Sequence, residues 1–153
     1  MTEKLPRPEE CNCFAIRSAA RHVSQYYDRY LAATGLRTTQ FSILAKLKRL
    51  GPLTINELAR QMVMDRTTLG RNIKPLERDG LVSIEPAQSD RRAKELRLTK
   101  TGEKQLEAGF EAWSRAQTGF ESTFGPKHAA ELRRVLRNVI ATEFRPLARF
   151  VAM

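Results

Sequence analysis

The sequence predicts a mainly α-helical fold that carries one small β-hairpin. Apolar residues recur at helical spacing through most of the 153 residues, which is typical of helices that bury one face. Only two short stretches, LVSIE (81–85) and ELRLT (95–99), alternate apolar and polar residues as half-buried strands do. Predicted helices lie before the first stretch and after the second, so the hairpin is set within a helical chain.

Two helices are predicted in the N-terminal third of the chain. Apolar residues from Phe14 to Leu31 share one face of a long helix over residues 10–34, and Gly35 ends it. The stretch TTQFSILAKLKRL (38–50) forms the second helix, because a Gly-Pro pair follows it and cannot continue it. Its buried face is formed by Phe41, Leu44 and Leu47.

A short turn joins the next two predicted helices. The third helix, over residues 53–62, starts with a capping box, in which Thr54 and Glu57 each satisfy a backbone N–H of the other. The fourth helix, over residues 65–79, has Asp65 as its N-cap. The residues predicted to face the core are Ile55, Leu58, Ala59, Met62, Leu69, Ile73 and Leu76.

Pro75 interrupts the pattern of the fourth helix. An interior proline removes one backbone hydrogen bond and costs roughly 3 kcal/mol in an ordinary helix, so we expect a bend after Lys74. The hairpin follows, and its two strands are joined by a long tip, PAQSDRRAK (86–94).

Two long helices complete the predicted fold. Thr99 ends the second strand and caps a fifth helix, which the Gly-Pro pair at 125–126 breaks before a sixth. The apolar faces of these helices are marked by Leu106, Phe110, Trp113, Phe120 and Phe124, and by Leu132, Val135, Leu136, Val139, Ile140 and Phe144. A lobe of about 60 residues cannot cover such long apolar faces alone, so the terminal helices favour pairing of two copies.

The composition favours a polyanionic partner and excludes several other classes. The net charge is +10, and nucleic acid is the commonest partner of strongly basic proteins. Apolar runs are only a few residues long and the N-terminus lacks the apolar core of a signal peptide, so we expect a cytoplasmic protein without membrane contact. Two cysteines and His22 fall short of the four ligands of a metal site unless a dimer supplies the rest, and neither a metal nor a cofactor is expected.

Two helices joined by a short turn and followed at once by a hairpin form a winged helix-turn-helix, here over residues 36–100. The outward residues of the fourth helix are basic, hydroxyl or amide groups, and no outward carboxylate follows Asp65 until Glu77. Arginine can bind guanine, asparagine can bind adenine, and threonine can bond a phosphate or touch a thymine methyl. The candidate DNA contacts of this lobe are Thr54, Arg66, Thr67, Thr68, Arg71, Asn72 and Lys74.

The hairpin tip adds a second candidate DNA contact. It carries Arg91, Arg92 and Lys94, and such a tip can reach a flanking minor groove that attracts arginine. Asp90 could orient one arginine through a carboxylate-guanidinium fork. The alternative is a charged loop without a partner, and the basic helix beside it favours the DNA contact.

The stretch LTINELARQMVMDRTTLGRNIKPLERDGLVSIEPAQSDRRAKELRLTKTG resembles the MarR family of bacterial transcription regulators. Its DRRAKELRLT segment is similar to the family's Asp-x-Arg-x-x-x-Leu-x-Leu-Thr pattern, and Pro75 departs from many members. The resemblance implies one domain over 1–153 and an obligate homodimer that binds palindromic double-stranded DNA. It also implies dimerisation helices over 10–34 and 101–150, with Arg92 as the wing arginine and Asp90 as its partner.

The same resemblance implies a repressor that a small aromatic acid or drug-like effector releases from DNA. The pocket would lie between the dimer helices and the winged lobe. The residues that would line it are Phe14, Arg17, Tyr26, Tyr27, Tyr30 and Phe41. The alternative is that most of these aromatic side chains belong to the core.

The segment CNCFAIRSAAR is similar to the start of organic-peroxide sensors of that family, where a Cys-Phe pair opens the first helix. Cys13 matches the oxidised cysteine and Tyr27 one tyrosine that holds it, whereas Arg17 and Thr38 stand where two other tyrosines are expected. A thiolate near a helix N-terminus is stabilised by amide dipoles. Cys11 could resolve a sulfenic acid at Cys13 through a strained loop or from the other chain. The alternative is a small buried side chain at Cys13 and an idle thiol at Cys11.

Two function classes remain beside the DNA-binding regulator. An enzyme is not expected, because the sequence has no Gly-rich phosphate loop, nucleophile elbow, HExxH motif or paired carboxylates. A winged-helix protein-protein adaptor without a DNA target would have an acidic or apolar fourth helix, whereas this one is basic.

Overall fold

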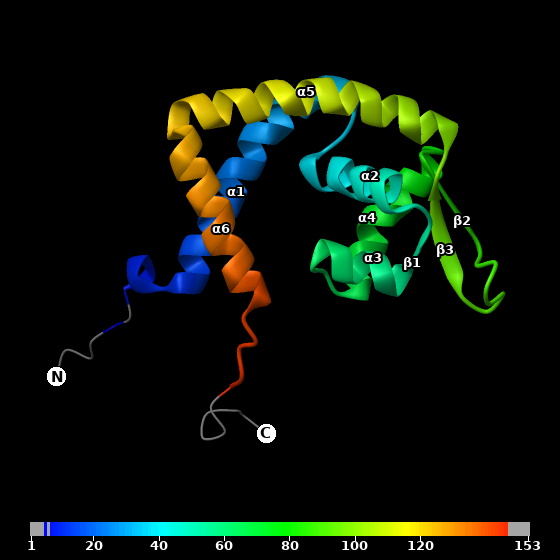
Figure 1. The fold of residues 1–153 in the computed structure, drawn as a ribbon, viewed down its shortest axis with the longest axis horizontal. Coiled ribbons are helices and arrows are strands. Elements are labelled where there is room, and N and C mark those ends of the chain that lie inside the picture. The colour runs from blue at the N-terminus through cyan, green and yellow to red at the C-terminus, as the bar shows by residue number, and fades with distance from the viewer. Residues whose placement is uncertain (1–4, 6, 147–153) are drawn as a thin grey trace. The chain divides into compact units, whose positions relative to one another are not determined.

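The computed structural model describes residue 5 and residues 7–146, and the chain divides into two compact units, residues 1–116 and 117–153. The α-helices and strands are labelled in Figure 1, and the order of elements in the described residues also includes the short 3-10 helices η1 and η2. In chain order the elements are η1 (Pro8–Glu10), α1 (Asn12–Leu31), η2 (Ala32–Thr34), α2 (Thr38–Leu50), β1 (Leu53–Thr54), α3 (Ile55–Met62), α4 (Arg66–Arg78), β2 (Val82–Pro86), β3 (Lys94–Leu98), α5 (Lys100–Phe124) and α6 (Pro126–Ala141). Within the described part of the chain, every helix is too short or too polar to cross a membrane.

The order of the predicted helices and of the hairpin is confirmed, and the sheet is larger than predicted. The residues expected at the start of the third helix form β1, which pairs antiparallel with β3 so that Leu53 lies opposite Leu96. The strand order is β1-β3-β2, and Val82 of β2 lies opposite Leu98 of β3. Two residues are too few to show an alternating pattern, which explains why β1 was missed.

Side chains from other elements and from the turns hold the helix starts in place. Asp28 of α1 accepts hydrogen bonds through Oδ1 from both the backbone N–H and the hydroxyl of Thr38, each at 2.7 Å. This carboxylate therefore satisfies a free N–H at the start of α2, where Arg37 has no acceptor to offer. The predicted cap of α5 is confirmed, because Thr99 Oγ1 accepts from the Gly102 N–H at 3.0 Å.

The fourth helix is longer than an interior proline would normally allow. Figure 1 shows α4 as one helix, and it runs through Pro75 to Arg78. Pro75 has no N–H to donate to the carbonyl of Arg71, so that turn lacks one bond. The helix ends before Gly80, which adopts a positive φ of 74°.

The core of the first unit lies between α2, α3, α4 and the sheet. The seven largest side chains that are fully buried are Leu31, Ile43, Leu44, Leu58, Leu69, Leu76 and Leu96. The predicted inward faces of the second, third and fourth helices are confirmed, since Phe41, Leu47, Ala59 and Ile73 are also buried and Ile55 and Met62 pack against them. The winged lobe thus has a continuous core, to which Leu31 of α1 and Ala112 of α5 also contribute.

The first part of α5 packs on this core through the predicted Leu106 and Trp113, which are partly buried, and also through small residues that were not predicted. Gly102, Gly109, Ala112 and Ala116 are its buried residues. A Cβ on Gly109 would lie 2.9 Å from Cδ2 of Phe41, so only glycine permits this close approach. Phe110, predicted to lie on the buried face, is 57% exposed.

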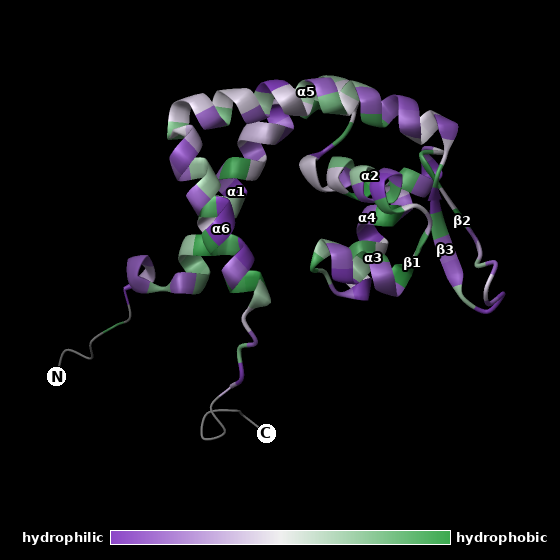
Figure 2. Cartoon of the chain, in the orientation of Figure 1, coloured by the Kyte–Doolittle hydropathy of each residue, from purple (hydrophilic) through white to green (hydrophobic). Residues whose placement is uncertain are grey.

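The second unit contains the end of α5 and all of α6. Arg133 of α6 pairs with Glu121 of α5 at 3.0 Å, and Ala129 is buried. Figure 2 shows hydrophobic residues, in green, along α6. Many of them are exposed in the single chain, namely Leu132, Val135, Leu136 and Ile140, and Phe144 lies exposed beyond the end of the helix. Residues 147–150 of the predicted dimerisation segment lie outside the described residues.

The turn between α3 and α4 holds a strained residue. Val63 follows α3 with φ 53° and ψ 47°, a left-handed conformation that β-branched residues rarely adopt. Its side chain is 66% exposed, so little packing depends on it.

Val63→Gly is therefore expected to raise the free energy of unfolding by about 1 kcal/mol, because glycine adopts this backbone conformation without the steric cost. Urea denaturation at one protein concentration measures the change. Val63→Ala keeps a Cβ and serves as the control, with a smaller gain expected. A glycine variant no more stable than the wild type would show that the turn is not strained.

Candidate nucleic-acid interface

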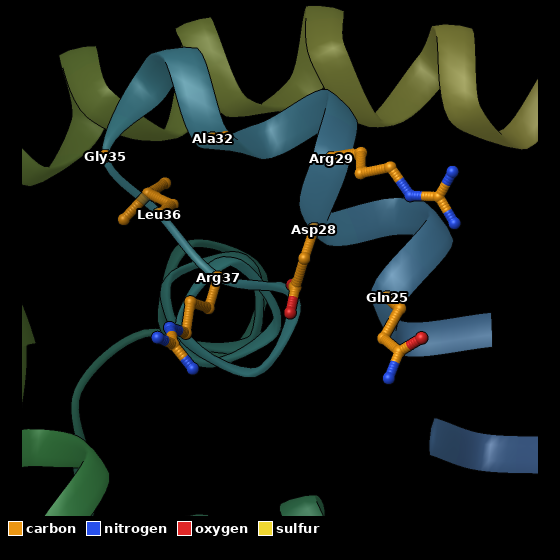
Figure 3. Close-up of a pocket in the computed structure, with 7 residues that line it drawn as sticks. All are labelled: Gln25, Asp28, Arg29, Ala32, Gly35, Leu36 and Arg37. Atoms are coloured by element: carbon orange, nitrogen blue, oxygen red, sulfur yellow. The ribbon is translucent and has the colours of Figure 1, made fainter. Parts of the chain in front are cut away.

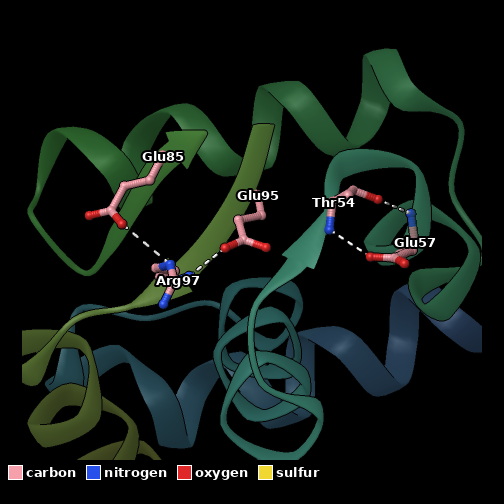
Figure 4. A network of polar contacts seen from close by, with 5 residues as sticks. All are labelled: Thr54, Glu57, Glu85, Glu95 and Arg97. Atoms are coloured by element: carbon pink, nitrogen blue, oxygen red, sulfur yellow. Dashed lines mark hydrogen bonds and ion pairs between the residues drawn. The ribbon is translucent and has the colours of Figure 1, made fainter. Parts of the chain in front are cut away.

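The turn and the caps of α3 and α4 orient the candidate recognition helix. Thr54 Oγ1 accepts from the Glu57 N–H at 3.2 Å, and Glu57 Oε2 accepts from the Thr54 N–H at 2.8 Å (Figure 4). The predicted capping box is thus confirmed. The bond from the Thr54 N–H is the main cause that lowers the pKa of Glu57. The half-buried Thr54 hydroxyl, predicted to contact DNA, already accepts a bond in this cap.

The start of α4 is held by the predicted N-cap. Asp65 Oδ1 accepts from the Thr68 N–H at 2.8 Å, and Oδ2 accepts from the Thr68 hydroxyl at 2.7 Å. These bonds, the backbone one first, hold the pKa of Asp65 below the ordinary range of an aspartate. The carboxylate is therefore ionised at neutral pH, and both of its oxygens accept hydrogen bonds from the first turn of α4.

The outward face of α4 carries the predicted polar residues. Arg66, Thr67, Thr68, Arg71 and Lys74 are all exposed. Asn72 is half-buried, and its Nδ2 donates to the carbonyl of Thr68 at 2.9 Å. Asn72 thus has one of its amide N–H groups engaged within α4.

The wing tip is a closed turn rather than a loose loop. The Ala87 N–H donates to the carbonyl of Ala93 at 2.8 Å, and the Ala93 N–H donates to the carbonyl of Asp90 at 3.0 Å. The carboxylate of Asp90 accepts from the backbone N–H of Arg92 at 3.0 Å. The predicted fork between Asp90 and an arginine guanidinium is therefore wrong for this structure, because the carboxylate holds the backbone of the turn.

Arg91, Arg92 and Lys94 are exposed at this tip. With Arg66, Arg71 and Lys74 of α4 they make six interface cations. None of the six forms an ion pair with a carboxylate among residues 5 and 7–146. Three carboxylates are adjacent to them in sequence: Asp65 and Asp90 accept bonds within their own segments, and Glu95 pairs with Arg97. The six cations therefore face solvent without a carboxylate partner.

Arg97 at the base of the wing contrasts with these six cations. Its Nε lies 3.3 Å from Glu85 Oε2 and its Nη2 lies 2.5 Å from Glu95 Oε1 (Figure 4). The half-buried guanidinium joins β2 and β3, which identifies Arg97 as a structural residue of the wing. This role depends on the register of the strands, in which Arg97 lies opposite Ser83 and near both glutamates.

The structure does not gather the six predicted effector residues into one pocket. Phe14 and Arg17 are exposed in the first half of α1, whereas Phe41 is buried and stacks on Trp113 at 6.1 Å between ring centroids. Tyr26 contacts Tyr27 and Tyr30 edge-to-face, with 5.6 and 5.3 Å between the ring centroids. These three tyrosines form one cluster, and Tyr26 donates to the carbonyl of Ala116 on α5 at 3.2 Å.

An open groove of about 630 Å³ lies instead between the end of α1 and the start of α2. Gln25, Asp28, Arg29, Ala32, Gly35, Leu36 and Arg37 line it. Figure 3 shows that the guanidinium groups of Arg29 and Arg37 point in different directions. The groove therefore lacks converging cations for a carboxylate ligand.

Both cysteines are exposed and free. Cys11 is the N-cap of α1, and its Sγ accepts from the Phe14 N–H at 3.4 Å. Cys13 lies in the first turn of α1 and its side chain is exposed, so the alternative of a buried Cys13 side chain is wrong for the single chain. The described residues contain no group of His, Cys, Asp and Glu that could hold a metal ion.

Three comparisons connect this geometry to known proteins. The family model described as "MarR family" matches residues 36–94, from before α2 to the wing tip. The transcriptional regulator MosR of M. tuberculosis is 34% identical in its crystal structure, with a TM-score of 0.74 over 89% of this chain and 100% of that chain. The chain belongs to the MarR family. This member also superposes on MosR in complex with DNA, with a TM-score of 0.75 over 88% of the chain.

Two curated sequences match this MarR family member over part of their length. The transcriptional activatory protein BadR of Rhodopseudomonas palustris is 32% identical over 92 residues, and the HTH-type regulator YwoH of Bacillus subtilis is 34% identical over 92 residues. The matches cover 58% and 60% of this chain, and 53% and 66% of the two relatives. The MarR family, to which the chain belongs, is a family of transcriptional regulators and not of enzymes.

Proposed function

We propose that the chain regulates transcription by binding a palindromic operator, as a homodimer, with sequence specificity. The observation that carries the proposal is the set of six interface cations. They lie on α4 and on the wing tip of one compact unit, and none of them forms an ion pair with a carboxylate of the described residues. A surface of this charge attracts the phosphate backbone of DNA.

Helix α4 and the wing tip are proposed to contact different grooves of the DNA. The exposed face of α4 suits the major groove, where Arg66, Thr67, Thr68, Arg71, Asn72 and Lys74 reach base edges and phosphates. The wing tip suits a flanking minor groove, where Arg91 and Arg92 enter and Lys94 contacts phosphate. Thr54 lies at the start of α3, where it supports a phosphate contact beside its capping role.

The proposed homodimer rests on the exposed apolar side chains of the terminal helices. Ile140 is 63% exposed and Phe14 is 47% exposed in the single chain. Burying such side chains against a second copy is favourable by about 25 cal/mol per Å². A twofold dimer then presents two winged lobes to half-sites ~10 base pairs apart. The expected dimerisation segments are 10–34 and 101–150, around a DNA-binding lobe over 36–100.

The decisive experiment is a binding titration with promoter fragments across a salt series. Affinity is expected to fall steeply with salt while a preference for one sequence remains. Arg92→Ala is expected to weaken operator binding about tenfold and to reduce the salt slope by about one, with the dimer intact. Arg49→Ala removes an exposed cation from α2, outside the expected dimerisation segments, and is the charge-matched control.

Two outcomes would contradict the proposal. A protein-protein adaptor would show neither steep salt dependence nor sequence preference. Unchanged operator affinity of the Arg92→Ala variant would remove the wing from the DNA interface while leaving α4 in place.

We further propose that the regulator is a repressor that a small aromatic acid or drug-like compound releases from DNA. The tyrosine cluster around Tyr26 supports an aromatic ligand, because edge-to-face contacts can extend to another ring. Arg17 and Phe14 lie on the same helix, and Phe41 borders α5. A reporter driven by the selected operator, screened with aromatic acids, tests both release and the direction of regulation.

A second candidate function is peroxide sensing at the cysteines. It is favoured by the exposure of both thiols and by the bond from the Phe14 N–H to Cys11 Sγ. Cys13→Ser is expected to abolish release from DNA by an organic peroxide, because the serine hydroxyl is not oxidised. Cys11→Ser keeps the Cys13 thiol, which can still be oxidised to a sulfenic acid. It therefore tests whether Cys11 is needed to convert that sulfenic acid into a disulfide. Release that persists in the Cys13→Ser variant would exclude this switch.

A further inference from the structure

The first turn of α4 contains a short chain of hydrogen bonds with a defined direction. Asp65 accepts from both the N–H and the hydroxyl of Thr68, at 2.8 and 2.7 Å. The carbonyl of Thr68 in turn accepts from Nδ2 of Asn72 at 2.9 Å. Asp65 and Thr68 are exposed, so this chain of bonds lies on the outward face of the helix.

The direction of the bond between Asp65 and Thr68 determines what the hydroxyl can offer to DNA. An ionised carboxylate only accepts hydrogen bonds, so the single hydrogen of the Thr68 hydroxyl points at Asp65. Its two lone pairs remain, and one can still accept a bond from outside. The hydroxyl therefore faces solvent as an acceptor and not as a donor.

We propose that Thr68 reads an amino-bearing base, adenine or cytosine, in the major groove, and that Asp65 is the positioning residue that sets this preference. The proposal rests on the proposed function of α4 as the recognition helix. Adenine presents N6–H₂ and cytosine presents N4–H₂ in that groove, and both are donors. Guanine O6, thymine O4 and phosphate oxygens only accept, and they leave the acceptor on Thr68 unsatisfied.

The neighbouring side chains complement this acceptor. Arg66 and Arg71 carry only donors, which suit the O6 and N7 acceptors of guanine. Asp65 adds a second acceptor beside Thr68 and repels phosphate. The start of α4 thus presents hydrogen-bond acceptors among its cations. One position of each half-site should therefore favour a base that donates, whereas the positions that the arginines contact favour a base that accepts.

The test is selection of bound duplexes from a randomised library with the full-length protein. The wild type is expected to prefer adenine or cytosine over guanine or thymine by about three- to tenfold at one position per half-site. Thr68→Val removes the acceptor at nearly constant volume and should reduce that preference below twofold. Thr68→Ser keeps the hydroxyl and should restore it.

Asp65→Asn separates the positioning role from a structural one. Asparagine is also a good N-cap, so α4 should still start at the same residue, which circular dichroism and urea denaturation verify. Its Nδ2 can donate to Thr68, which frees the threonine hydrogen, and the preference for amino-bearing bases should be lost. Thr101→Val on α5 makes the same isosteric change away from the interface and should leave the selected sequence unchanged.

The outcomes separate this inference from the proposed function. If the wild type selects no sequence, the proposed function fails and this inference fails with it. If the wild type selects a clear sequence but Thr68→Val alters no preference for adenine or cytosine, only the role of Thr68 is overturned. A thymine preference at that position that Thr68→Val keeps and Thr68→Ser loses would assign the contact to the threonine methyl group, and it would also overturn the role of the hydroxyl.

Discussion

Gly102→Ala is expected to destabilise the winged lobe by about 3 kcal/mol, the largest effect on stability that the fold predicts. A Cβ at this position would lie 2.1 Å from the carbonyl oxygen of Leu81 and 2.7 Å from Cδ1 of Leu98. The same carbonyl accepts from the Thr99 N–H at 3.1 Å, so moving it also weakens the start of α5. Urea denaturation of wild type and variant at equal protein concentration measures the loss.

Gly70→Ala is the matched control for this substitution. Gly70 also lies inside a helix, but nothing lies within 4 Å of the position of its Cβ. The alanine variant should be more stable than the wild type by about 0.5–1 kcal/mol, because alanine has the higher helix propensity. If Gly102→Ala were tolerated as well as Gly70→Ala, α5 would not approach the wing as closely as the structure shows.

The packing of α5 illustrates why part of the fold was beyond prediction from the sequence. Helix starts at Thr54, Asp65 and Thr99 follow from local hydrogen bonds, and all three were predicted. The buried face of α5 is different, because close approach of two backbones requires small residues such as Gly102 and Gly109. A search for large apolar residues at helical spacing finds Leu106 and Trp113, which pack on the core, but it misses the small residues between them.

The candidate site shows a similar limit. Residue types and spacing were sufficient to place the cations of α4 and the wing tip. They could not show that Asp90 holds the Arg92 backbone, because a carboxylate can accept from a guanidinium or from a peptide N–H equally well. They also could not separate the paired Arg97 from the unpaired Arg92, which depends on the register of β2 and β3.

Arg71→Ala is expected to have the largest effect on DNA recognition. Arg71 is exposed in the second turn of α4 and forms no ion pair within the described part of the chain, so its guanidinium is free to bind a base. A bidentate arginine-guanine contact contributes about 1–3 kcal/mol of discrimination, which corresponds to a loss of about 5- to 150-fold. Competition titrations with operators that differ by one base pair measure the loss at each position.

Arg78→Ala on the same helix is the control. Arg78 lies in the last turn, where its Nε pairs with Asp79 at 3.1 Å, so its loss should change the affinity little and the base preference not at all. Loss of the guanidinium at position 71 should relax the preference at particular base pairs, whereas a phosphate contact would weaken all sequences alike. An Arg71→Ala variant with every base preference intact would therefore place Arg71 on the DNA backbone, and sequence reading would have to come from other side chains of α4.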